Sequence, residues 1–81
     1  MKRQEIFAKV EDIFKDLLDD EDFKLTEEMS ADDIQEWDSL FHITLIASIE
    51  DEFKISISTT EVAKAKNIGV MLDMIERELG A

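Results

Sequence analysis

The 81-residue sequence contains no cysteine, which excludes a disulfide, a thiolate nucleophile and a sulfur-ligated metal. It has no proline and only two glycines, a composition that argues against a β-rich fold built on tight turns and favours an all-α one. No hydrophobic run is long enough to span a bilayer, and the charged start lacks the apolar stretch of a signal peptide. We therefore expect a cytoplasmic protein without a membrane partner.

Basic residues are also scarce, with nine Lys and Arg against 21 Asp and Glu and a net charge of −12. Binding to a phosphate backbone needs the opposite sign, so nucleic acid is excluded as a partner. The expected partner is a protein with a basic patch that this surface attracts. The length allows one small domain, residues 1–81, and excludes an enzyme with a cleft between two lobes. We expect a monomer.

Hydrophobic periodicity predicts a small bundle of three main helices plus a short one. The main helices cover about residues 3–18, residues 39–53 behind an Asp38 cap, and the stretch from the Asn67 cap to Gly80. A capping box at Ser58 predicts the short helix, which runs through Lys64. Residues 55–58 alternate as a short strand would, but we interpret them as a connector. The predicted core comprises Phe7, Val10, Phe14, Ile46, Ile49, Phe53, Leu72 and Ile75.

Residues 19–38 lose this periodicity and carry ten acidic residues against the single base Lys24. They predict a long loop, and loops of this length in small domains are more often functional than idle. The acidic run at residues 19–22 lacks the spacing of a calcium-binding EF-hand, since Gly69 is the first glycine, so we predict no metal site. Apolar residues are expected to hold the loop on the core: Phe23, Leu25, Met29, Ile34 and Trp37.

Ser39 lies where this loop meets the second main helix. Unpaired N–H groups and the helix dipole would stabilise a phosphate ester there, although Asp38 and Ser39 are also ordinary residues for a helix start. His42 follows one turn later, but no glycine-rich elbow or oxyanion loop accompanies the pair. We therefore expect no enzyme activity, and a His42 that is partly buried beside the core.

The residues around Ser39 resemble those of the acyl carrier proteins and their peptidyl and D-alanyl relatives. The resemblance covers nearly the whole chain and centres on Glu36-Trp37-Asp38-Ser39-Leu40, followed by an apolar and then acidic helix (Ile43, Leu45, Ile46, Ile49, Glu50, Asp51, Glu52 and Phe53). It implies that Ser39, flanked by Asp38 and Leu40, carries 4′-phosphopantetheine added from coenzyme A by a phosphopantetheinyl transferase. The thiol of that arm would hold acyl or aminoacyl groups as thioesters for enzymes of fatty acid, polyketide or related biosynthesis.

The resemblance also implies two further sets of residues. Partner enzymes with basic patches would contact Leu40, Ile43, Ala47, Glu50 and Asp51, with Asp38 pairing in the same way. The acyl chain would enter a pocket with walls from Ile46, Ile49, Val62, Leu72 and Ile75. His42 would then lie beside the core or beside the arm.

Three positions depart from the pattern of fatty-acid-synthesis carriers. Glu36 stands where those carriers have a glycine, Thr44 replaces an acid, and Ala65 is small for the pocket mouth. A tryptophan directly before Asp38-Ser39-Leu40 is more similar to the pattern of specialised stand-alone carriers. The alternative hypothesis is an acidic helical interaction module without a covalent group, and it differs from the carrier in tolerating the loss of Ser39.

Overall fold

The structure, a computed structural model, describes residues 2–80 and the side chains within them except those of Thr59 and Ala63. In chain order the elements are α1 (Arg3–Leu18), the 3₁₀ turn η1 (Ala31–Asp33), α2 (Ser39–Phe53), α3 (Thr59–Ala63) and α4 (Ile68–Glu78). Residues 2–80 contain no strand, so the prediction of three main helices and a short one is confirmed. The turn η1 inside the long loop was not predicted. Within the same range, no helix combines the length and apolar character needed to cross a membrane.

The starts of α2, α3 and α4 are capped by the predicted side chains. Asp38 Oδ1 accepts a hydrogen bond from the Phe41 N–H at 2.8 Å, and Asn67 Oδ1 accepts one from the Val70 N–H at 3.0 Å. Ser58 Oγ accepts a longer bond, 3.4 Å, from the Glu61 N–H at the start of α3. Each cap satisfies a backbone donor that the first turn of a helix leaves unpaired.

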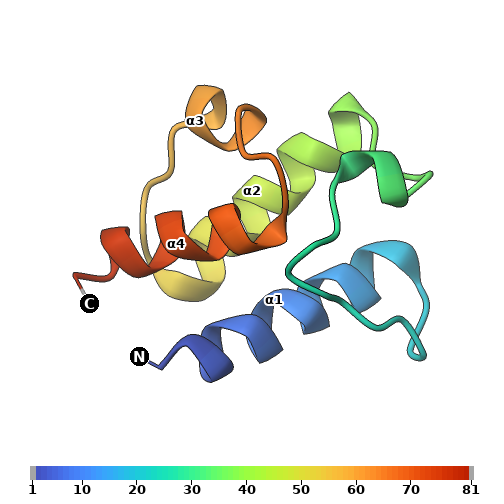
Figure 1. Ribbon diagram of the computed structural model, residues 1–81, viewed down its shortest axis with the longest axis horizontal. Helices are drawn as coiled ribbons and strands as arrows, with labels where there is room; N and C mark the ends of the chain where they lie inside the picture. Colours follow the sequence, from blue (N-terminus) through green and yellow to red (C-terminus); the bar gives the residue numbers. More distant parts are fainter. Residues whose placement is uncertain (1, 81) are drawn as a thin grey trace.

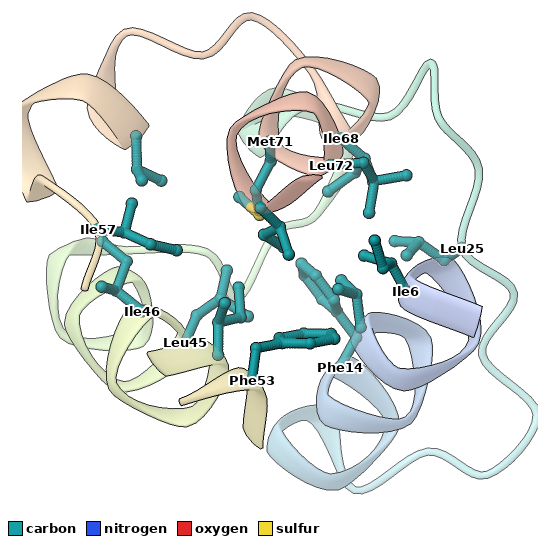
Figure 2. Packing of buried hydrophobic residues seen from close by; sticks show 14 of the residues in the cluster. Ile6, Phe14, Leu25, Leu45, Ile46, Phe53, Ile57, Ile68, Met71 and Leu72 are labelled. Atoms are coloured by element: carbon teal, nitrogen blue, oxygen red, sulfur yellow. The ribbon is translucent and has the colours of Figure 1, made fainter. Parts of the chain in front are cut away.

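The core forms where α1 packs against both α2 and α4, while α3 lies away from α1 (Figure 1). Figure 2 shows side chains of α1, α2 and α4 meeting in one cluster. Seven of the eight predicted core residues are buried there: Val10, Phe14, Ile46, Ile49, Phe53, Leu72 and Ile75. The prediction for Phe7 was wrong, because Phe7 is only partly buried and its neighbour Ile6 is the fully buried residue of that turn.

The long loop is held on the core, as its apolar residues predicted. Leu25 and Ile34 are buried, and Phe23, Met29 and Trp37 pack against the cluster while staying partly exposed. The loop backbone is bonded as well, since the Leu25 N–H donates to Glu11 Oε2 at 2.9 Å.

The long loop passes beside the start of α4 (Figure 1), and two of its carbonyls complete that helix end. The N–H groups of Ile68 and Gly69 donate to the carbonyl oxygens of Met29 and Glu27, at 2.8 and 2.9 Å. These are the first two residues of the helix, whose N–H groups have no partner within it. The loop thus supplies acceptors for two N–H groups of α4 that the Asn67 side chain, bonded to the Val70 N–H, does not reach.

Arg3 joins the loop to α1 and α4. Its guanidinium donates to both carboxylate oxygens of Glu27, at 2.8 and 3.2 Å, to Asp73 at 2.7 Å, to Glu76, and to the Gly69 carbonyl at 3.1 Å. The hydrogen bond from Arg3 lowers the pKa of Glu27, and in return Glu27 and its neighbours raise the pKa of Arg3. One cation therefore fixes three parts of the chain on one side of the molecule.

Candidate functional site

Ser39 is the first residue of α2, and its side chain is exposed at the end of the long loop. Asp38 precedes it in extended conformation and turns its carboxylate to the Phe41 N–H. The next backbone bond, from the His42 N–H to the Asp38 carbonyl at 2.9 Å, begins the helix. The serine hydroxyl is therefore presented on a rigid helix end and is open to another molecule.

A cavity of about 470 Å³ opens directly beside Ser39, a volume in the range of small-molecule sites. It lies between the loop, α2, α3 and the start of α4, and Met71 from α4 forms part of its wall. The described lining residues are Ser30, Ala31, Trp37, Asp38, Ser39, His42, Ile43, Val62, Ala65, Asn67 and Met71. A chain attached to Ser39 has a mostly apolar space within reach.

Trp37 and His42, which precede and follow Ser39 in the sequence, both line this cavity and are bonded to each other. The Trp37 ring packs edge-on against Phe14, with ring centroids 5.5 Å apart, and its Nε1–H donates to His42 Nδ1 at 3.1 Å. Trp37 therefore both anchors the loop and orients the imidazole. His42 is partly buried, as expected, and its Nε2 is buried without a hydrogen-bond partner among residues 2–80.

This geometry differs from a Ser-His-acid triad. In a triad, His Nδ1–H donates to a carboxylate that orients the ring. Here Nδ1 accepts from an indole, which can only donate, so the arrangement required for general-base catalysis is absent from the described site.

Most of the predicted partner residues lie on the exposed side of α2. Leu40 and Ile43 are 73% and 60% exposed, unusually high for large apolar side chains, and Ala47 and Asp51 are exposed as well. The spacing of these four residues places them along one side of the helix. Glu50 differs from them, because it is partly buried and its Oε2 accepts a hydrogen bond from the Ile57 N–H at 2.8 Å.

The predicted pocket residues separate into two groups. Val62 lines the cavity beside Ser39, whereas the other four, at most 2% exposed, lie in the core and are absent from the described lining: Ile46, Ile49, Leu72 and Ile75. Their role as pocket walls stays a prediction. The predicted pocket omitted Trp37, His42 and Met71, which line the cavity. Trp37 lies two residues before Ser39 and His42 three residues after it, so their closeness in sequence could have identified these two as lining residues.

Comparison with known proteins gives the family. No protein-family model matches the sequence. An acyl carrier protein of Thermotoga maritima is 32% identical to it over 78 residues, which cover 96% of each chain. The chain belongs to the acyl carrier protein family. An acyl carrier protein of Thermosynechococcus vestitus is 33% identical over 81 residues, the full length of both chains.

A solved structure supports the same assignment. The solution NMR structure of a holo acyl carrier protein from Geobacter metallireducens superimposes with a TM-score of 0.83 at 39% identity, covering 93% of this chain and 86% of that one. The resemblance to the acyl carrier protein family and the all-α fold are thereby confirmed. An acyl carrier protein is a carrier and not an enzyme, which agrees with the geometry of Ser39 and His42.

Proposed function

We propose that this acyl carrier protein carries its cofactor, 4′-phosphopantetheine, on the hydroxyl of Ser39. The observation that supports this proposal is the exposed serine at the first position of α2, opening onto the cavity. A covalent group of that length needs an accessible hydroxyl and an adjacent space, and the residues present provide both. A phosphopantetheinyl transferase adds the group from coenzyme A.

The start of α2 suits a phosphodiester. The N–H groups of Ser39 and Leu40 are the first two of the helix and have no partner within it, and the helix dipole adds positive potential at that end. The Asp38 carboxylate is bonded to the Phe41 N–H. The bound group supplies a terminal thiol, which this cysteine-free chain lacks, and acyl groups are held on it as thioesters.

Partner enzymes of lipid, polyketide or related biosynthesis dock on the exposed side of α2. Leu40, Ile43 and Ala47 provide a small apolar strip, and Asp51 provides a negative charge beside it. A carrier must release each partner, so a small interface guided by charge is better suited than a large apolar one. The net charge of −12 draws basic partners to this surface.

Intact mass measures the proposed modification directly. The apo protein is incubated with coenzyme A and a broad-specificity phosphopantetheinyl transferase, with Ser39→Ala as the matched control. We expect the mass of one phosphopantetheine to be added to the wild type only. Folded, unmodified wild type that gains no mass would contradict the proposal and favour the acidic interaction module.

A further inference from the structure

His42 holds a polar group for which the described fold provides no partner. Its Nε2 is shielded from water and makes no hydrogen bond within residues 2–80, although buried polar groups in native proteins are nearly always paired. The residue lines the cavity beside Ser39. Because this unsatisfied nitrogen belongs to a residue that lines a ligand-sized space, it indicates a partner that the described chain does not contain.

The bond from Trp37 decides what kind of partner this is. The indole N–H can only donate, so His42 Nδ1 carries a lone pair and the proton of the neutral ring lies on Nε2. The unpaired group of this cavity-lining residue is therefore a hydrogen-bond donor. Its complement is an acceptor such as a carbonyl oxygen.

We propose that the Nε2–H of His42 donates a hydrogen bond to a carbonyl oxygen of the group attached to Ser39 and so holds that group in the cavity. The proposal rests on the proposed function. Positions 39 and 42 are three residues apart and lie on the same side of α2, so the group begins within one turn of the donor. Both the amides of the arm and the thioester of the cargo have such oxygens.

The other walls fit a bound arm. Ile43, Val62 and Met71 offer apolar surface to methylene groups. The Nε2 atom of His42 is closed to water in this conformation, and the flexible thioether of Met71 is suited to make room when the cavity fills. Trp37 acts as a positioning residue, because its N–H keeps the proton of His42 on the nitrogen that remains free.

NMR of a ¹⁵N-histidine-labelled sample tests the contact without any mutation. His42 is the only histidine, so its two ring nitrogens are assigned at once. Apo, phosphopantetheinylated and hexanoylated samples are compared, each verified by intact mass. We expect the Nε2–H signal to shift and its exchange with water to slow about threefold to tenfold, the range of one net hydrogen bond.

The three samples separate the two sources of the acceptor. A change that appears with the arm alone assigns an amide carbonyl, and a change that appears only after acylation assigns the thioester carbonyl. Unchanged His42 signals in both modified samples would overturn the inference while the mass gain keeps the proposed function intact. A chain that gains no mass would instead end the proposed function and this inference with it.

Variants give a second, quantitative readout. His42→Phe keeps a ring but removes the donor, while Met71→Leu changes the same cavity wall without altering any donor. If the thioester carbonyl is the acceptor, the hydrogen bond keeps the thioester in the cavity and away from hydroxylamine. We therefore expect hydroxylamine to cleave the hexanoyl thioester about threefold to tenfold faster in His42→Phe and near the wild-type rate in Met71→Leu. Trp37→Phe, which lets the proton occupy either nitrogen, gives an intermediate rate. If the NMR shows such an acceptor and folded His42→Phe cleaves at the wild-type rate, the inference fails.

Discussion

The loop between α1 and α2 is bound firmly at its middle and sparsely at its end. Near Glu27 the loop is bonded to the Arg3 guanidinium, and its carbonyls receive the first N–H groups of α4. Near Ser39, by contrast, the side-chain anchoring of Trp37 is ring packing and one bond to His42, and the other nitrogen of that imidazole has no partner in the described chain. The middle of the loop therefore stabilises the fold, whereas its end lies beside an unpaired nitrogen that a ligand can bind.

Phe14 packs against both the start and the end of the loop, so its truncation should have the largest effect. It is fully buried, and the centroid of its ring lies 5.9, 5.5 and 5.8 Å from the ring centroids of Phe23, Trp37 and Phe41. We expect Phe14→Ala to lower the free energy of unfolding by about 3–5 kcal/mol in urea titrations. Phe7→Ala, on the same helix but partly exposed, is the control; equal losses would show that the aromatic cluster adds nothing.

Glu27→Gln weakens only the firmly bound middle of the loop, and the stability that it loses relative to the wild type depends on pH. Arg3 lowers the pKa of Glu27 in the folded state, so the stabilisation is complete above the ordinary glutamate value of about 4.5 and disappears as pH falls through the lower folded pKa. We expect the variant to melt below the wild type at pH 7 and to converge with it in acid. Glu28→Gln, next in sequence and exposed, is the control. A gap between wild type and Glu27→Gln that does not change with pH would contradict the prediction.

Asp51→Lys should change partner recognition and leave both loop regions intact. Because Asp51 is exposed beside the apolar strip of α2, we expect reversal of its charge to slow phosphopantetheine transfer roughly twofold to fivefold at low salt, with less effect at high salt. Asp12→Lys changes the net charge equally on α1. Similar slowing in both variants would show that total charge, rather than this surface, guides the partner. Glu50 is a poorer test, because reversing it also removes the bond to the Ile57 N–H.

The smallest expected effect concerns the end of α2, far from the loop. Lys54 ends the helix at φ 58°, a left-handed conformation that costs a lysine more than a glycine, whereas Lys64 ends α3 at φ −87°. Lys54→Gly should therefore raise the free energy of unfolding by about 0.5–1 kcal/mol, and Lys64→Gly should bring no gain. Thermal melts of the two variants compare them directly, and stabilisation by both or by neither would refute the conformational argument.

The helices were predictable from sequence because their determinants are local. Asp38 and Asn67 cap helices that the apolar spacing already located, and the loop residues Leu25 and Ile34 reach the core as their apolar character indicated. The Arg3 contacts were not predictable, since they join residues far apart in the sequence.

The site was predictable only in part for a similar reason. Ser39 followed from its position at a helix start and from the family resemblance. The cavity depends on the path of the loop, which places Trp37 against Phe14 and its N–H on His42. The sequence does not show that Asp51 is exposed whereas Glu50 is hydrogen-bonded. That difference arises because the connector brings the Ile57 N–H to Glu50.

The bonds from Ile68 and Gly69 to the loop carbonyls also bear on the order of folding. α4 completes its first turn only when residues 27–29 are already in place, which makes that turn a contact of long sequence separation. Closing such a contact costs chain entropy before its hydrogen bonds can form. We therefore expect the start of α4 to form late, after α1 has organised the loop. Amide exchange at Ile68 and Gly69 therefore reports how often the loop lifts from the bundle, rather than how often the helix frays.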